Sequence, residues 1–239
     1  PVVSSAASDV YKRQSLNMAS SAAAAATGRD AVITMLPDGG TLRQVAADVI
    51  PVMAAGSALI DCSTVDVDSA RDVAAMAGEA GLLAVDAPVS GGVGGARSGS
   101  LTFMAGGPDA GFALAAPLFE IMGAKAVHCG GSGAGQAAKI CNNMILGATM
   151  IVTCEAFALA DGLGLDRQKM FDVVSTSSGY SWSMNSYCPA PGVGPDSPAD
   201  NGYMPGFSAD LMLKDLRLAL QAAQSAGADT PVSYTHLTL

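Results

Sequence analysis

In the segment GGSGAGQAAKICNN, residues Gly130–Asn143, a glycine-rich turn leads into a long apolar run that is typical of a helix. Lys139, Asn142 and Asn143 interrupt the start of that run. Their spacing of i, i+3 and i+4 places them on one helical face. Burying a cation and two amides without partners costs free energy, so we expect these side chains to meet a polar ligand. The alternative is that Lys139 is an ordinary surface lysine whose stem lies along apolar neighbours.

Upstream of this segment, short apolar runs alternate with amphipathic stretches. The runs predict strands at 30–37, 58–64, 81–85, 101–106 and 124–129, and the stretches predict helices at 20–27, 41–54, 68–80 and 112–122. This alternation is typical of βαβ units around a parallel sheet. Polar residues follow three of these strands, at Pro37-Asp38, Ser63-Thr64 and Ser90. Ligands bind at the carboxyl edge of such a sheet, so this edge is a candidate site.

From residue 132 onward the pattern is helical, with helices predicted at 136–162, 166–175 and 208–226 and a Pro/Gly/Ser-rich loop at 180–204. The fold class is therefore α/β plus all-α, with a partial sheet domain at 1–131 and a helical domain at 132–239. The run beginning at Met144 is apolar enough to suggest a membrane span. Polar residues, among them Lys139 and Glu155, lie close to both of its ends, so we expect a buried helix between two domains.

The composition is that of a well-buried globular protein, with 50% hydrophobic and 14% charged residues. A formal net charge of −9 disfavours nucleic acid or an anionic membrane as the main partner. The five cysteines form no C-x-x-C pair, and there are only two histidines. This pattern fits neither a disulfide framework nor a metal site, and it favours a reducing cytoplasm.

A second glycine-rich segment, DAPVSGGVGGARSG, covers Asp86–Gly99. Glycines after a strand allow several backbone N–H groups to face one point, and such a turn binds a carboxylate or a phosphate. Ser90 adds a hydroxyl donor. The alternative is a flexible loop without a ligand. A third segment, in which Lys214-Asp215 stands beside a leucine stripe, is by itself typical of a solvated helix edge.

Five segments, in order, resemble the β-hydroxyacid dehydrogenase family. They are ITMLP (Ile33–Pro37), DAPVSGGVGGARSGSLTFMAGG (Asp86–Gly107), GQAAKICNNM (Gly135–Met144), SWSMNSYCPAPG (Ser181–Gly192) and GFSADLMLKDLRLA (Gly206–Ala219). The loop that carries Trp182, Tyr187, Pro189 and Pro191 favours the 3-hydroxyisobutyrate branch over the tartronate semialdehyde and phosphogluconate branches.

The resemblance implies a Rossmann-type domain and a helical domain joined by a long interdomain helix, with the active site between them. It implies that Lys139 is the catalytic proton donor or acceptor and that Asn143 helps to position the substrate. The remaining implied roles are substrate carboxylate binding by Ser90, Gly91 and Gly92, and NAD binding by Leu36, Pro37, Thr64 and Lys214. The resemblance implies no metal site, and it implies a homo-oligomer.

The reaction implied is hydride transfer from 3-hydroxyisobutyrate to NAD, which gives methylmalonate semialdehyde in bacterial valine breakdown. Tartronate semialdehyde or another short 3-hydroxy acid is an alternative substrate. A non-catalytic helical dimerisation remnant is an alternative of another class.

The chain departs from the family at its ends. No G-x-G-x-x-G turn precedes Ala22, so we expect a fragment that is inactive alone. Residues 1–14 and 232–239 differ in composition from the interior and resemble translated sequencing adapters, so we expect them to be artefactual.

Overall fold

A computed structural model describes residues 17–204 and 206–235, and it divides the chain into two compact units, Pro1–Lys139 and Ile140–Leu239. The division falls inside one helix, α7 (Ala134–Gly162). The domain boundary at 131/132 remains a prediction. The segments predicted to be artefactual lie mostly outside the described residues, although 232–235 belong to α11 (Pro231–Thr235).

The first unit is built on a sheet with the strand order β1-β2-β3-β5-β4, and β6 also pairs with β5. The strands are β1 (Ala31–Thr34), β2 (Ala58–Asp61), β3 (Leu83–Asp86), β4 (Val89–Ser90), β5 (Leu101–Gly106) and β6 (Gly123–Gly130). Pairing is parallel along β1-β2-β3 and between β5 and β6, but β5 runs antiparallel to β3 and β4. The predicted α/β class is confirmed, with an antiparallel insertion in the parallel sheet.

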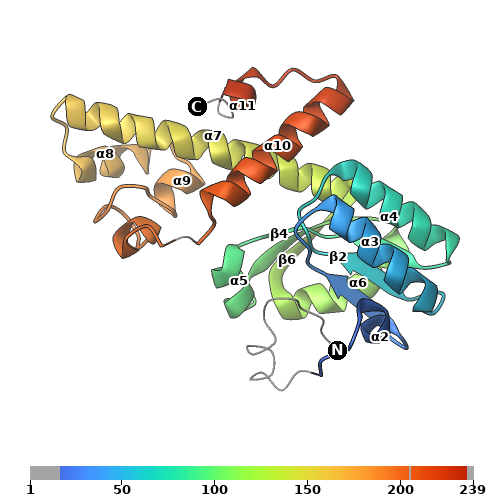
Figure 1. The fold of residues 1–239 in the computed structure, drawn as a ribbon. Coiled ribbons are helices and arrows are strands. Elements are labelled where there is room, and N and C mark those ends of the chain that lie inside the picture. The colour runs from blue at the N-terminus through green and yellow to red at the C-terminus, as the bar shows by residue number, and fades with distance from the viewer. Residues whose placement is uncertain (1–16, 205, 236–239) are drawn as a thin grey trace. The chain divides into compact units, whose positions relative to one another are not determined.

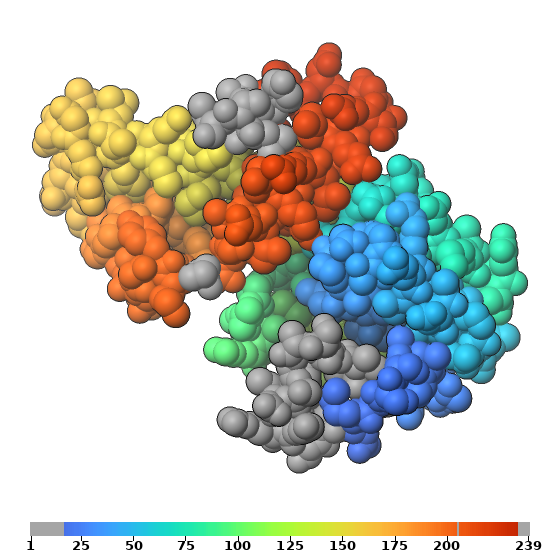
Figure 2. Space-filling view, in the orientation of Figure 1, coloured from blue at the N-terminus to red at the C-terminus, as the bar shows by residue number. Residues whose placement is uncertain are grey.

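Helices cover both faces of this sheet (Figure 1). Leu59 of β2 packs with α3 (Gly39–Val49), α4 (Val67–Glu79) and α2 (Ala22–Ala26), whereas its neighbours Ala58 and Ile60 pack with α6 (Asp109–Met122). This alternation follows from the two-residue period of a strand. Figure 2 shows the blue and cyan side chains of α3 and α4 on the outside of the unit.

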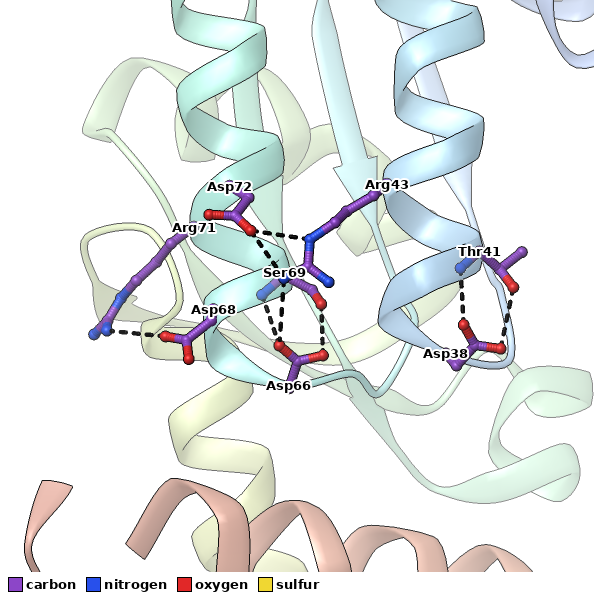
Figure 3. Close-up of polar contacts among 8 residues, drawn as sticks. All are labelled: Asp38, Thr41, Arg43, Asp66, Asp68, Ser69, Arg71 and Asp72. Carbon is purple, nitrogen blue, oxygen red and sulfur yellow. Dashed lines mark hydrogen bonds and ion pairs between the residues drawn. The ribbon is translucent and has the colours of Figure 1, made fainter. Parts of the chain in front are cut away.

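Helices α3 and α4 begin side by side, and each begins at an aspartate that accepts a backbone hydrogen bond (Figure 3). Asp38 accepts from Thr41 N–H at 2.8 Å and Asp66 accepts from Ser69 N–H at 2.8 Å. A Cβ on Gly39 would overlap the Ser69 hydroxyl, so only glycine allows this approach. Arg43 of α3 pairs with Asp72 of α4 at 2.8 Å.

The glycine-rich segment after β3 is not an open loop. Ser90 lies in the short strand β4, opposite Thr102 of β5, and Gly91 and Gly92 turn the chain with positive φ angles of 126° and 59°. A short helix, α5 (Gly92–Ser98), follows. Its buried Gly95 packs against Leu101, where a Cβ would come to 3.2 Å from the side chain. Glycine has a low helix propensity, so the sequence favoured a loop, and close packing on β5 overrides that preference.

The second unit is helical, as predicted. It contains most of α7 together with α8 (Arg167–Val174), α9 (Trp182–Asn185) and α10 (Ala209–Ala226). The predicted loop at 180–204 contains α9 and a 3-10 turn, η2 (Pro198–Asn201). Buried Phe157, Met170, Met184 and Cys188 form the core of this unit. A Cβ on Gly147 of α7 would lie 3.1 Å from Leu216 and 3.2 Å from Met212 of α10, and Figure 1 shows α10 crossing α7.

Helix α7 is long and apolar enough to cross a membrane by length and composition, and 28% of its most apolar window is buried. The predicted buried helix is therefore correct for one face only. The opposite face exposes apolar side chains at Ile145, Val152 and Leu159. These positions recur at helical spacing, so they form one stripe, which we call the α7 stripe.

The start of α7 packs directly on the ends of β3 and β5. A Cβ on Gly135 would overlap the carbonyl oxygens of Asp86 and Met104. A Cβ on Gly106 of β5 would come within 2.6 Å of Gly135 N. The approach therefore requires glycine on both the helix and the strand.

This packing generates a prediction about two glycines of the same helix. Gly135→Ala is expected to destabilise the first unit by roughly 1–3 kcal/mol because the methyl group overlaps backbone oxygens. Gly162→Ala is the matched control, since a Cβ there meets nothing within 4 Å. It is expected to stabilise α7 by about 0.5–1 kcal/mol. Urea unfolding of both variants measures the difference, and equal effects would contradict the packing argument.

Candidate active site

The carboxyl ends of β1 and β2 are joined through the buried carboxylate of Asp61. Thr34 Oγ1 donates to Asp61 Oδ1 at 2.7 Å, and Ser63 Oγ donates to the same oxygen at 2.6 Å. Ser63 Oγ also accepts from the N–H of Leu36 at 2.7 Å. These bonds hold the Leu36-Pro37 segment beside the turn that carries Thr64. Desolvation raises the pKa of Asp61, and its hydrogen bonds oppose that rise.

A second buried carboxylate, Asp86, ends the neighbouring strand and lies opposite Asp61 in the sheet register. It accepts from Gly133 N–H at 2.7 Å and from Gln136 N–H at 2.9 Å. Burial raises the pKa of Asp86 to about 6, while these two backbone bonds act in the opposite direction. The carboxylate thus satisfies N–H groups at the start of α7 that have no partner within the helix.

Lys139 and Asn143 lie one helical turn apart on α7, and both side chains are buried. Asn142, which was expected to share their face, is exposed and donates from Nδ2 to Asn143 Oδ1 at 2.9 Å. The hydrogen bond from Asn142 therefore orients the side-chain amide of Asn143. Of these three residues, Lys139 and Asn143 are the two that are buried.

Asp215 of α10 is a functional candidate that sequence reasoning missed. Its side chain is 2% exposed, and its Oδ2 accepts from Asn143 Nδ2 at 2.6 Å. Lys214 Nζ lies 3.4 Å from Asp215 Oδ1. The Lys-Asp pair is therefore not a solvated helix edge, because its carboxylate is buried against α7. The only sequence signal was the aspartate itself, interrupting a leucine stripe.

The aromatic residues of the 180–204 segment form a stacked pair. The Trp182 and Tyr187 rings lie 4.9 Å apart, inclined by 21°. Trp182 remains half exposed, while the neighbouring Met184 and Cys188 are buried in the core of the unit. The pair therefore presents an apolar aromatic surface rather than filling the core.

Two family models match successive parts of the chain. A family model described as the NAD binding domain of 6-phosphogluconate dehydrogenase matches residues 2–131. A model described as NAD-binding of NADP-dependent 3-hydroxyisobutyrate dehydrogenase matches residues 133–238. The 3-hydroxyisobutyrate dehydrogenase of Pseudomonas aeruginosa is 50% identical over 217 residues, covering 90% of this chain and 73% of that protein.

The chain belongs to the 3-hydroxyisobutyrate dehydrogenase family.

The names of two further relatives mention L-serine, another hydroxy acid. The solved structure of Mycobacterium tuberculosis 3-hydroxyisobutyrate dehydrogenase with L-serine matches with a TM-score of 0.88 and 46% identity, over 92% of this chain and 75% of that one. An NAD-dependent L-serine dehydrogenase of Pseudomonas aeruginosa is 44% identical, over 92% of this chain and 75% of that protein. This member of the 3-hydroxyisobutyrate dehydrogenase family is thus an NAD-binding oxidoreductase of the β-hydroxyacid dehydrogenase type.

The geometry at the carboxyl edge fits a dinucleotide. The backbone of Leu36 and the Thr64 turn are held together through Ser63, on the edge of the sheet where such a ligand lies. The described residues contain no G-x-G-x-x-G turn, so the fit concerns only the segments that follow β1 and β2.

The raised pKa of Asp86 predicts how a neutral replacement behaves with pH. The folded protein binds this proton more tightly than the unfolded chain, whose aspartate has a pKa of 3.8. The contribution of Asp86 to stability is therefore largest below pH 3.8 and is lost as pH rises through about 6. Relative to Asp86→Asn, the wild type is expected to lose about 3 kcal/mol between these limits.

Urea unfolding at pH 4, 5, 6 and 7 measures this difference. The exposed Asp48→Asn variant supplies the background for an Asp-to-Asn change in the same unit. A stability difference between wild type and Asp86→Asn that stays constant over this range would show that the carboxylate is not destabilised by burial.

Proposed function

We propose that this enzyme oxidises 3-hydroxyisobutyrate, the substrate that its relatives' names indicate, to methylmalonate semialdehyde with NAD, as a step of valine breakdown. The observation that carries the proposal is the buried pair Lys139 and Asn143 on α7. A buried ammonium or amine with an amide beside it suits proton transfer at a substrate oxygen. The 50% identity to the Pseudomonas aeruginosa enzyme supports the choice of substrate.

In the proposed reaction, Lys139 Nζ receives the hydroxyl proton while the hydroxyl-bearing carbon becomes a carbonyl. NAD, when bound, accepts the hydride from that carbon. Asn143, held by Asp215, orients the substrate oxygen towards Lys139. Reduction of the aldehyde uses the same groups in reverse, with Lys139 as the proton donor.

The remaining roles follow from the positions of the residues. Gly91 and Gly92 turn the backbone after Ser90, and we assign these three residues to the substrate carboxylate. We assign Leu36, Pro37 and Thr64 to NAD, because they follow the ends of β1 and β2. We assign Lys214 to NAD as well, because it matches the family's cofactor lysine in the segment Gly206–Ala219.

L-Serine is the second candidate substrate, favoured by the L-serine dehydrogenase at 44% identity and by the solved relative with L-serine. It has the same hydroxymethyl group and carboxylate, and it carries an ammonium where 3-hydroxyisobutyrate carries a methyl group. Tartronate semialdehyde, tested in the direction of reduction, is the third candidate. The ratios of kcat/KM for the three compounds decide among them.

In an active form of the enzyme, Lys139→Ala is expected to lower kcat by about 10²- to 10⁴-fold, because it removes the proton acceptor. The readout is NAD reduction with 3-hydroxyisobutyrate and L-serine. Lys125→Ala, on an exposed strand position, is the matched control and is expected to keep wild-type turnover. Near-normal turnover of a folded Lys139→Ala variant would refute the mechanism. A wild-type chain that binds no NAD would instead favour the non-catalytic dimerisation remnant.

We further propose that the protein is a homo-oligomer assembled through the α7 stripe. The stripe exposes three large apolar side chains on one face of a 29-residue helix, with Val152 56% and Leu159 63% exposed. Contiguous apolar patches of this kind mark interaction surfaces. The five free cysteines and the two bacterial relatives support the cytoplasm of a bacterium as its location.

Light scattering after size-exclusion chromatography tests the assembly. The double variant Val152→Lys/Leu159→Lys is expected to reduce the molar mass to that of one chain, 23.7 kDa, because charges in the stripe oppose burial. Val173→Lys on α8, also exposed but outside the stripe, is the control and is expected to leave the mass unchanged. An oligomer that persists in the double variant would exclude the stripe as the interface.

A further inference from the structure

The first two turns of α7 are tied to the sheet by a set of buried polar bonds. Asp86 accepts from the N–H groups of Gly133 and Gln136 at 2.7 and 2.9 Å. The side chain of Gln136 makes two more bonds: its Oε1 accepts from Val65 N–H at 3.2 Å, and its Nε2 donates to the Ser63 carbonyl at 2.8 Å. All of these groups belong to the first unit.

Each of these bonds leads to a segment of the candidate site. Ser63 and Val65 flank Thr64. The side chain of Gln136 therefore hydrogen-bonds to the backbone on both sides of a residue assigned to cofactor binding. Asp86 stands four residues before Ser90, on the strand that leads to the substrate-binding turn. Lys139 follows Gln136 by three residues and therefore lies on the same side of α7, roughly 4.5 Å further along the helix axis.

Gln136 and Asp86 occupy buried positions that an apolar side chain would fill at a lower desolvation cost. Gln136 is fully buried at 0% exposure, and Asp86 is 6% exposed. An apolar side chain of similar size fills such a position without the cost of desolvating polar atoms. What hydrogen bonds add is direction, because apolar packing has no preferred orientation.

We propose that Gln136 and Asp86 are positioning residues that hold Lys139 at a fixed place relative to the Thr64 turn and the strand leading to Ser90. The proposal rests on the role of Lys139 proposed above. Gln136 fixes the rotation of α7 about its axis, because its two bonds point in one direction from the helix. Asp86 fixes the height of α7 above the sheet, because it accepts from the N–H groups of the first turn.

Gln136→Met tests this function directly, since methionine keeps the length of the side chain and removes both bonds. The kcat of the folded variant is expected to fall on the order of 10- to 100-fold, because small displacements of a catalytic group are costly. The KM for the hydroxy acid is expected to stay within about threefold, since the residues assigned to its carboxylate are untouched. Gln168→Met, at an exposed glutamine of α8, is the matched control and is expected to keep wild-type kcat.

Gln136→Glu separates positioning from stability. The glutamate keeps an acceptor for Val65 N–H and, when protonated, regains a donor for the Ser63 carbonyl. Its kcat is expected to lie between those of the wild type and Gln136→Met, and the deficit is expected to shrink as pH falls. A role in stability alone predicts wild-type kcat for the folded fraction of both variants, at temperatures well below their Tm.

A measurement independent of turnover is the acylation of Lys139 by acetic anhydride, compared with that of Lys125 in the same molecule by peptide mass spectrometry. The ratio of the two rates is expected to rise severalfold in Gln136→Met and to stay unchanged in Gln168→Met. An unchanged ratio in Gln136→Met overturns the proposal, whether or not the enzyme turns over. If the wild type oxidises none of the hydroxy acids while the ratio still rises in Gln136→Met, that result supports the positioning role and refutes only the proposed function.

Discussion

The carboxylate of Asp86 connects the sheet to the helix on which the proposed chemistry depends. It ends β3, it is buried, and it accepts two N–H groups from the first turn of α7. A helix start that lies on a sheet edge leaves backbone donors without water, and a carboxylate is the strongest acceptor available for them. Glycines at 106 and 135 allow the two backbones to come close enough for these bonds.

Buried carboxylates recur in both units, and each links elements of its own unit that are distant in the sequence. Asp61 joins the ends of β1 and β2, Asp86 joins β3 to α7, and Asp215 joins α10 to Asn143 on α7. Each has at least one hydrogen-bond donor, as a buried charge requires. Within each unit, these hydrogen bonds fix the polar side chains in position, which suits a reaction that needs its groups held in one place.

The sequence was sufficient for the elements that depend on local patterns. The strand predicted at 101–106 matches β5, and the helices predicted at 136–162 and 208–226 agree with α7 and α10 within two residues. Local pattern failed at α5, where packing of Gly95 against Leu101 outweighs the low helix propensity of glycine. Lys139 and Asn143 were identified because polar residues interrupt an apolar run.

The residues that support Lys139 and Asn143 were missed for a common reason. Gln136 bonds to residues 71 and 73 positions away, and Asn143 bonds to Asp215 across 72 positions. A single aspartate or glutamine beside an apolar run has no local feature that distinguishes a buried partner from a solvated one. Such pairs emerge only when the tertiary fold brings the two segments together.

The boundary between the two units lies within α7, between Lys139 and Ile140, so the backbone that crosses it is helical. Proteases cut extended, accessible backbone and cleave regular helices poorly. Limited digestion of the native enzyme should therefore spare this boundary and begin in the irregular segment between α8 and α10. The two units of this chain are consequently not separable modules in the usual sense, because the structural element that ends one of them also begins the other.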